Sequence, residues 1–121
     1  MLDSIIEQIR LGIFEKYQEY FQSPPILLKG KLRCIFIDGG LLDIHYPQID
    51  EYSFHFMRQS IIERVDTSPY HPNIGTFPNH HHHLEENNIQ EDKISIFEGD
   101  PLENAINFLK IIIQSYYEET S

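Results

Sequence analysis

The chain has a single cysteine, no tryptophan and no long hydrophobic run. Cys34 has no second cysteine with which to form a disulfide, and within the apolar run LRCIFI it is expected to be a small core residue. No apolar stretch approaches the roughly 20 residues that a membrane-spanning helix needs, and the first ten residues lack the basic and apolar segments of a secretory signal. These absences favour a soluble, cytoplasmic protein without a membrane span.

The chain also lacks an excess of basic residues, since nine Lys and Arg stand against 19 Asp and Glu, for a formal net charge of −10. The acid is concentrated at the two ends, whereas residues 28–83 are nearly neutral and contain all seven histidines. No large basic face for sequence-independent binding of nucleic acid is evident. The acidic ends suit a basic partner protein, although charged helix faces are commonly only solvated.

The apolar and aromatic residues that are present suffice for one folded domain. Hydrophobic residues make up 40% of the 121 positions, and eight Phe and seven Tyr supply large side chains. A chain of this length and composition is expected to fold as a single domain over residues 1–121, without a linker or an internal repeat.

Two amphipathic helices are predicted at the ends of this domain. Over residues 4–22, apolar side chains recur every three or four positions, and Ser4 followed by Glu7 has the spacing of a capping box. The sequence SPP then ends the helix, because proline removes a backbone donor. In EGDPLENAINFLKIIIQSYYEE, Asp100 as N-cap and Pro101 at the first helical position predict the start of the second helix.

Between the helices the hydrophobic period changes to two, which is typical of strands. Residues 31–46 predict one hairpin closed by the turn sequence DGG, and YSFHFM followed by IIERVD predicts a second hairpin closed around residues 58–60. The run KISIF at residues 93–97 allows a further short strand. Four antiparallel strands in meander order are the simplest arrangement.

From Thr67 to Gln90 the composition shifts to Pro, Asn, Gly and His, and no periodicity remains. Five of the seven histidines lie in residues 68–86, four of them consecutively at 80–83. A long irregular segment inside a small domain is usually either functional or disordered, so it is not assigned to any element. The expected fold class is therefore α+β, with an N-terminal helix, a four-stranded antiparallel meander, a long His- and Pro-rich loop and a C-terminal helix.

The stretch from residue 52 to residue 83 resembles a known family. It combines YSFHFM, an Arg-x-Asp pair in IIERVD, a His-Pro turn, and Thr-Phe-Pro ahead of the histidine run. This pattern resembles the signature of the TumE-type toxins of bacterial and archaeal toxin–antitoxin modules, over about a quarter of the chain. Asn79 and His81 depart from it, since the family pattern has a histidine at the first position and a lysine or apolar residue at the second. The matching positions are Tyr52, His55, Arg64, Asp66, His71, Pro72, Thr76, Phe77, Pro78, His80 and His82.

The resemblance implies a small toxin in the broad company of RelE-like ribonucleases, encoded beside an antitoxin with a helix-turn-helix fold. It also directs attention to five of the matching positions as candidate catalytic residues. These are Arg64, Asp66, His71, His80 and His82.

The chemistry of these residue types suits RNA cleavage without a metal, which needs a base, an acid and a cation beside the phosphate. Histidine suits the first two roles because its pKa lies near neutrality, and Arg64 can hold two phosphate oxygens. Arg64 and Asp66 lie two apart in a predicted strand and so share a face, where Asp66 can orient a partner. His71 can meet His80 and His82 if HPNIGTFP folds back. In an extended segment alternate residues point to opposite sides, so at most two histidines of the run are expected in one site.

Each of these features also has a purely structural interpretation. Arg64 and Asp66 can form an ordinary salt bridge on a sheet face. His45 and His55 lie in alternating strands and are expected to be partly buried with one satisfied nitrogen. Phe77 could stack on a base, but it is more simply a plug that packs the loop onto the sheet.

A run of four histidines can also bind zinc or nickel adventitiously. No cysteine pair and no spaced set of carboxylates and histidines accompanies the run. We therefore predict neither a metal site nor another cofactor.

Two functions from different classes follow. The first is the toxin of a type II module, a possible metal-independent endoribonuclease that acts on RNA or translation, with a helix-turn-helix antitoxin as partner. The acidity argues against naked RNA as substrate, and a ribosome-bound RNA or an antitoxin that covers a local positive patch reduces the objection. The second is a non-catalytic protein-binding module with a structural or pH-responsive histidine loop. An exposed edge strand would also allow a homodimer.

Overall fold

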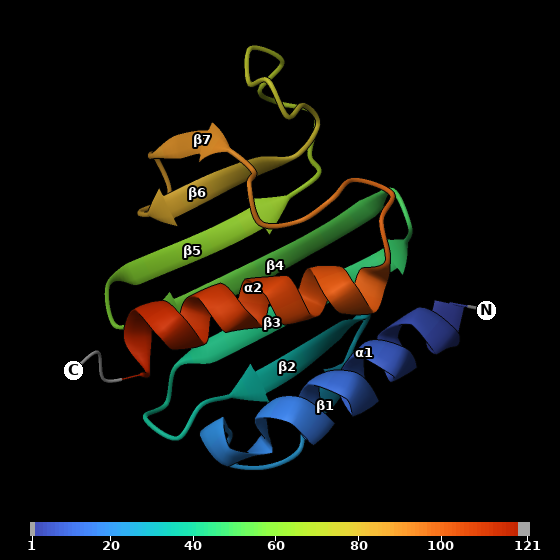
Figure 1. Cartoon of the computed structure of the whole chain (residues 1–121), viewed down its shortest axis with the longest axis vertical. Helices are drawn as coiled ribbons and strands as arrows, with labels where there is room; N and C mark the ends of the chain where they lie inside the picture. Colours follow the sequence, from blue (N-terminus) through green and yellow to red (C-terminus); the bar gives the residue numbers. More distant parts are fainter. Residues whose placement is uncertain (1, 119–121) are drawn as a thin grey trace.

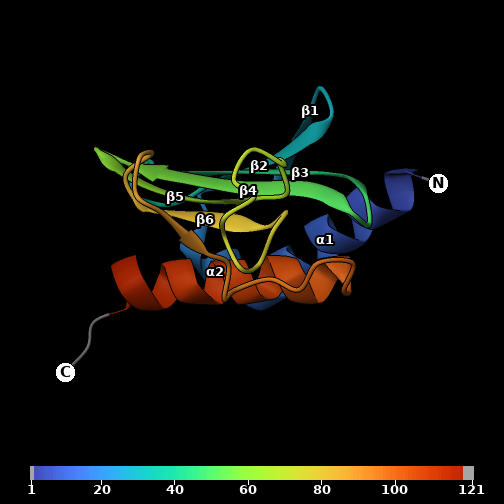
Figure 2. The same cartoon turned by 90° about the horizontal axis from the view of Figure 1, so that it is seen from above.

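The computed structural model describes residues 2–118 as an antiparallel sheet with two long helices on one of its faces (Figures 1 and 2). Each strand pairs with its neighbours in chain order, so the sheet is a meander. We call the face that α1 and α2 cover the helix face and the opposite face the open face. The elements are α1 (Leu2–Tyr17), the 3-10 helix η1 (Gln18–Tyr20), β1 (Ile26–Leu28), β2 (Lys31–Ile35), β3 (Leu41–Gln48), β4 (Glu51–Arg58), β5 (Ile61–Asp66), β6 (His80–Leu84), β7 (Ile89–Glu91) and α2 (Pro101–Tyr116).

The N-terminal helix packs its apolar stripe on the sheet, as predicted. Ile9 and Ile13, one turn apart, are completely buried. The helical segment ends at Tyr20 rather than at residue 22, because Phe21 adopts an extended conformation and packs edge-on against Phe36 with ring centroids 5.3 Å apart. An aromatic contact with the sheet therefore ends the helix before the prolines do.

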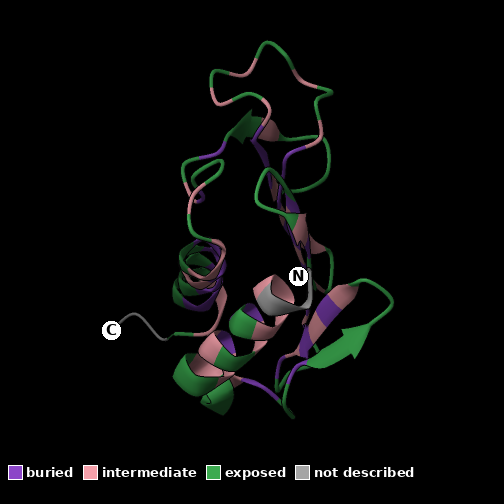
Figure 3. Cartoon of the chain, turned by 90° about the vertical axis from the view of Figure 1, so that its right-hand side faces the viewer, coloured by how far each residue is buried: buried purple, intermediate pink, exposed green. Residues whose placement is uncertain are grey.

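The C-terminal helix begins as the sequence predicts. The carboxylate of Asp100 accepts a hydrogen bond from the backbone N–H of Glu103 at 2.9 Å, and Pro101 occupies the first helical position. The cap predicted for the other helix involves the side chain of Ser4, which lies outside the described side chains. The buried residues of α2 face the sheet (Figure 3); they are Asn104, Ala105, Phe108, Leu109, Ile112 and Ile113.

The two predicted hairpins are present as β2–β3 and β4–β5. In the DGG turn, Gly39 has a φ of +93°, a conformation that glycine adopts without strain. Along each strand, alternate residues are buried against the helices, which fixes the pairing register because a one-residue slip would expose all of them. These core residues are Leu32, Cys34, Leu42, Ile44, Tyr46, Tyr52, Phe54, Phe56 and Val65.

The prediction of four strands is wrong, because the sheet has seven. The largest difference is β6, which consists mainly of the histidine run that the composition assigns to an irregular segment. The run KISIF at residues 93–97 is not a strand, and β7 lies before it. Histidine shows no apolar periodicity, so only the pairing of β6 between β5 and β7 makes it a strand.

The irregular segment that precedes β6 is confined to residues 67–79 and is held at its C-terminal end (Figure 1). The hydroxyl of Thr76 donates to the carbonyl of Asn79 at 2.8 Å and accepts from the backbone N–H of Asp92 at 2.9 Å. The buried Asn79 amide donates to the Tyr52 hydroxyl at 2.7 Å and to the Asp92 carboxylate at 3.1 Å. These contacts fix where the segment joins the sheet. Within residues 2–118, neither helix is long and apolar enough to cross a membrane.

Candidate functional site

On the open face, a single carboxylate of β5 meets two histidines of β6. Asp66 and His80 are paired in register, and His82 lies two residues further along the same face. Asp66 Oδ1 is 3.0 Å from His80 Nε2, and Asp66 Oδ2 is 3.9 Å from His82 Nε2. The carboxylate is itself buried, and its Oδ1 also accepts from the backbone N–H of Ser68 at 2.9 Å. Asp66 therefore orients the His80 ring at the end of β5.

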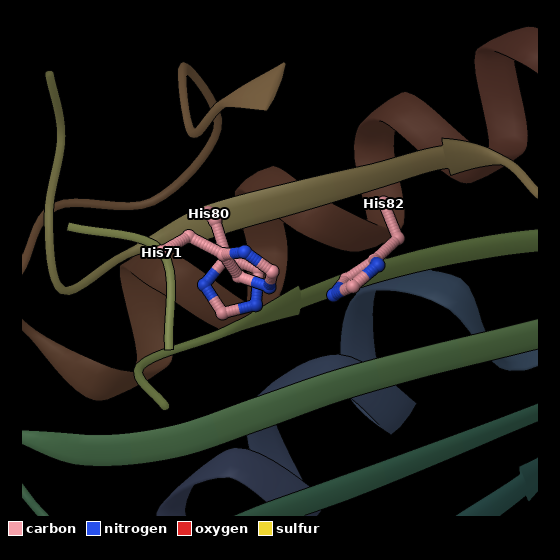
Figure 4. Close-up of side chains that lie close together, drawn as sticks. All are labelled: His71, His80 and His82. Carbon is pink, nitrogen blue, oxygen red and sulfur yellow. The ribbon is translucent and has the colours of Figure 1, made fainter. Parts of the chain in front are cut away.

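The segment after β5 brings a third histidine to this pair (Figure 4). The ring centroid of His71 lies 4.6 Å from that of His80 and 6.1 Å from that of His82, and all three rings meet edge to face. The segment thus folds back, which is the condition on which the meeting of these histidines depends. His80 and His82 share the open face, and the two other histidines of the run point to the helix face.

Arg64 completes the group, which we call the open-face cluster: Arg64, Asp66, His71, His80 and His82. Arg64 Nε lies 2.8 Å from Asp66 Oδ2, so these two side chains form the salt bridge that their structural interpretation allows. Its Nη1 donates to Glu86 at 3.1 Å. Glu86 lies between β6 and β7, and sequence reasoning missed it because nothing along the chain links it to Arg64. The guanidinium is therefore shared between one buried and one exposed carboxylate.

The two imidazoles from β6 are almost fully buried, whereas His71 and Arg64 are partly exposed. Burial lowers the pKa of His80, and the charge of Asp66 opposes that effect without overcoming it. His80 Nδ1 lies 3.2 Å from the carbonyl of Pro78. Both ring nitrogens of His80 thus face acceptors, an arrangement that accommodates a protonated ring as well as a neutral one.

A cavity of about 430 Å³ opens beside the cluster on the open face. Hydroxyls, an imidazole and both members of the ion pair line it together with the carboxylates of Asp50 and Glu51, so a polar ligand placed there would meet charges of both signs. The lining includes His45, Ser53, Arg64, Asp66, Ser68 and Pro69.

The remaining histidines of the strands lie outside the cluster. His45 is exposed rather than partly buried, and its Nδ1 lies 2.9 Å from the carbonyl of Gly30, so one nitrogen is satisfied as expected. His55 is partly buried, and its Nε2 has no hydrogen-bond partner among the described residues. Burial and then the nearby charge of Arg64 lower the pKa of His55. Phe77 is 46% exposed, so the prediction that it plugs the loop onto the sheet is wrong.

Comparison of the sequence with models of known protein families shows which family the chain belongs to. A family model described as Toxin TumE matches residues 3–115, from α1 to the last turn of α2. The chain belongs to the TumE toxin family. The match extends well beyond the recognised motif at residues 52–83 and includes the whole open-face cluster. No curated protein and no solved structure matches the chain. Membership of the TumE family supports a toxin role.

The two departures from the TumE pattern both fall outside the open-face cluster. Asn79 is 2% exposed, and its amide fixes the end of the segment by hydrogen bonds to Tyr52 and Asp92. His81 points to the helix face, where Val65, its register partner, belongs to the core. Neither substitution therefore removes an imidazole from the cluster in this TumE-family chain.

A second polar cluster lies on the helix face and was missed by sequence reasoning. Glu63 Oε1 lies 2.7 Å from His81 Nε2 and 3.0 Å from His83 Nδ1, and the Tyr116 hydroxyl donates to the other oxygen. Burial alone would raise the pKa of Glu63, but hydrogen bonds from His81, Tyr116 and His83 outweigh burial and lower it. Glu63 and Asp66 are three residues apart in β5 and so face opposite ways. This spacing would have predicted a carboxylate for the histidines on each face of the sheet, but only if the histidine run had been recognised as a strand.

Metal ligands can be drawn from either face. The ligand atoms of His71, His80 and His82 lie within 4.8 Å of one another, and so do those of Glu63, His81 and His83. The alternation of β6 thus divides one histidine run between two sets with different chemistry: three imidazoles on the open face, and two imidazoles with a carboxylate on the helix face.

Proposed function

We propose that this chain is the toxin of a type II toxin–antitoxin module and that it cleaves RNA without a metal, as a RelE-like ribonuclease with a helix-turn-helix antitoxin as partner. The convergence of Arg64, Asp66, His71, His80 and His82 on the open face carries the proposal. These side chains come from β5, the following segment and β6, and they bring a guanidinium, a carboxylate and three imidazoles to one place.

In the proposed reaction His71, the partly exposed imidazole, acts as the base. It accepts the proton of the 2′-hydroxyl as that oxygen attacks phosphorus, and the bond from phosphorus to the 5′ oxygen breaks. A protonated His80 gives its proton to the departing 5′ oxygen. Burial lowers the pKa of His80, but Asp66 and the Pro78 carbonyl each face one nitrogen of the ring and so can hold the protonated form when the proton is bound. Arg64 stabilises the charge that builds on the phosphate oxygens.

Two contacts must open for a substrate to reach these groups. His80 is 2% exposed and lies under His71, so the segment that carries His71 has to shift when RNA binds. Arg64 must exchange its bond to Glu86 for a phosphate oxygen, and Glu86 is exposed enough to turn away into water. Glu86 therefore competes with the substrate for the guanidinium.

The open face reduces the objection raised by the net charge of −10. A row of paired residues crosses five strands on this face, in the order Arg33, Asp43, His55, Arg64 and His82. The excess of Asp and Glu lies in the two ends of the sequence, outside this row of residues. A phosphate backbone that follows this row meets two guanidinium groups and two imidazoles, and the one carboxylate of the row, Asp43, is paired with Arg33 and Lys31. Ribosome-bound RNA would meet little of the remaining surface.

The test is to replace Arg64, His71 and His80 singly by alanine and to measure growth arrest on expression and RNA cleavage by the purified protein. Removal of an acid or base is expected to lower the cleavage rate by about 10²–10⁴-fold. Arg58→Ala is the matched control, because its side chain is 33% exposed like that of Arg64 and also pairs with an aspartate. Undiminished growth arrest and cleavage in all three variants, each folded as judged by circular dichroism, would exclude the scheme.

Two further arms refine the mechanism. A chelator is expected to leave cleavage unchanged, and loss of cleavage with chelator would keep the nuclease but reject the metal-free chemistry. Glu86→Gln is expected to tighten RNA binding by several-fold, because it removes the carboxylate that competes for Arg64. Co-expression of the neighbouring helix-turn-helix gene is expected to relieve growth arrest.

The near-complete burial of His80 and His82 favours one alternative, a non-catalytic binding module in which the histidines are structural or pH-responsive. In that case the purified chain cleaves neither free nor ribosome-bound RNA. The alanine variants then change stability or partner binding instead of a cleavage rate.

A further inference from the structure

We propose that Glu63, His81 and His83 form a zinc site on the helix face of the sheet. The site lies on the opposite side of β5 and β6 from the open-face cluster and does not depend on the proposed ribonuclease activity. Glu63 and His83 are register partners on adjacent strands, and His81 lies two residues before His83 on the same face of β6. Their ligand atoms lie within 4.8 Å of one another.

The donor set matches zinc chemistry better than the three imidazoles of the open face do. Two imidazoles and a glutamate are a common three-ligand set for zinc that keeps one position open. The carboxylate of Glu63 also compensates part of the metal's charge. On the open face the nearby carboxylate, Asp66, is already paired with Arg64, and that guanidinium would repel a dication. Among the described residues, the helix-face set has no cation bound to its carboxylate, and Lys93 in the cavity beside His81 is accompanied by Glu91, so electrostatics favours the helix face.

Outer contacts hold these ligands in place, as they do in protein metal sites. The Tyr116 hydroxyl of α2 donates to Glu63 Oε2, which also lies 3.0 Å from His83 Nδ1, and Oε1 faces both imidazoles. The amide nitrogen of Gln90 lies 3.5 Å from His81 Nδ1 and helps to fix the ring whose Nε2 faces Glu63. Both partners come from elements other than β5 and β6, so the site ties together four parts of the chain.

Metal binding requires only small changes in this cluster. Without metal, His81 Nε2 and His83 Nδ1 carry the protons that bond to Glu63, and zinc would take the place of those protons. Each ring then moves its proton to its other nitrogen, where His83 meets water and His81 meets Gln90, whose amide can turn to present its oxygen. Ligand atoms of one tetrahedral zinc lie about 3.3 Å apart. Shifts of a few tenths of an ångström from the present contacts of 2.7 and 3.0 Å bring Glu63 to that spacing from each imidazole, and the ligand nitrogens of the two imidazoles lie within 4.8 Å of each other.

There is also room for a fourth ligand. A cavity of about 280 Å³ lies beside His81 and is lined as well by Gln90, Glu91 and Lys93. A water molecule can enter it and complete the coordination. The side chain of His83 is 41% exposed, so the metal has a route in from solvent.

The experiment uses the full chain without a terminal histidine tag, because a tag would bind the same metals. The metal-stripped protein is titrated with zinc chloride by calorimetry, and cobalt(II) is used in parallel for its tetrahedral absorption bands. We expect one zinc ion per chain and a melting temperature that rises with zinc concentration. His83→Ala is the principal variant, since this partly exposed side chain is not part of the core and its removal is expected to leave the fold intact. It is expected to lower zinc affinity at least tenfold.

The controls separate the two faces. His71→Ala removes the accessible imidazole of the other set and is expected to leave zinc affinity within twofold of the wild type. Tyr116→Phe is expected to weaken binding without changing the stoichiometry, because it frees Glu63 Oε2 but removes no ligand. Zinc binding that survives in His83→Ala and disappears in His71→Ala would overturn the proposal, as would the absence of zinc binding by the folded wild type. Neither outcome bears on whether the chain cleaves RNA.

Discussion

At the residue scale, the chemistry of this chain depends on two carboxylates that face opposite ways. Glu63 and Asp66 each meet two imidazoles of the same histidine run, and the alternation of β6 decides which imidazoles they meet. Each carboxylate therefore contacts the imidazoles on one face of β6. A run that looks uniform in sequence is divided into two sites with separate partners.

Buried histidines also make stability depend on pH. Burial lowers the pKa of both His55 and His80, so the folded chain resists a proton that the unfolded chain accepts near pH 6.5. The unfolded state then binds more protons just below that pH, and the free energy of unfolding falls as the pH falls, by at most about 1.4 kcal/mol per pH unit for each histidine. Urea unfolding at pH 7.5, 6.5 and 5.5 measures the slope.

His55→Gln provides the control for this prediction, because it removes one of the two titrating groups and leaves the open-face cluster intact. The variant is expected to show a shallower loss of stability between pH 7.5 and 5.5. Equal stability of the wild type at all three pH values would contradict the assignment of lowered pKa values.

At the scale of elements, residues 67–79 connect β5 to β6 and determine where His71 lies. The segment has no regular structure, but it is fastened near its end by Thr76 and Asn79. The middle of the segment has local backbone bonds, such as that from the Ile74 N–H to the His71 carbonyl, so it can shift about its fixed end without breaking strand pairing. The fold thus gives one connection both an anchor and the proposed base.

Thr76→Val tests that anchor, because valine keeps the shape of threonine and lacks its hydroxyl. The backbone N–H of the buried Asp92 then loses its acceptor, which is expected to cost about 1–3 kcal/mol of unfolding free energy. Toxicity is expected to fall as well, since His71 loses its position. Thr76→Ser retains the hydroxyl and is expected to stay close to the wild type; equal stability of the two variants would show that these bonds do not hold the segment.

At the scale of the whole molecule, the two edges of the sheet differ in how they meet solvent. β7 is short and carries Gln90 and Glu91, polar residues of the kind that discourage edge pairing. β1 is also short, but it exposes three apolar side chains, with Leu27 59% exposed. The sequence allows a homodimer through an exposed edge strand, and we expect β1 to be the edge that pairs.

Leu27→Lys tests this expectation by placing a charge on the edge. Light scattering after gel filtration is expected to show the wild type as a dimer at tens of micromolar and the variant as a monomer. Leu11→Lys, which changes an equally exposed leucine on α1, serves as the control and is expected to remain dimeric. A wild type that is monomeric at the highest concentration tested would contradict the prediction.

The sequence by itself determined the two helices, the two central hairpins and the α+β class, because each depends on local periodicity and capping. It also pointed to Arg64, Asp66, His71, His80 and His82 through resemblance, and the alternation rule correctly divided the histidine run. Their catalytic role stays a prediction, as does the single domain.

Only the tertiary structure decided that the histidine run is a strand, since histidine carries no apolar period and β6 exists through pairing with β5 and β7. For the same reason the sequence could not predict that Glu63 and Glu86 contact histidine and arginine side chains. Their partners lie about 20 residues away along the chain and become neighbours only through strand register. Local patterns record the elements, whereas contacts between distant residues depend on how those elements pack.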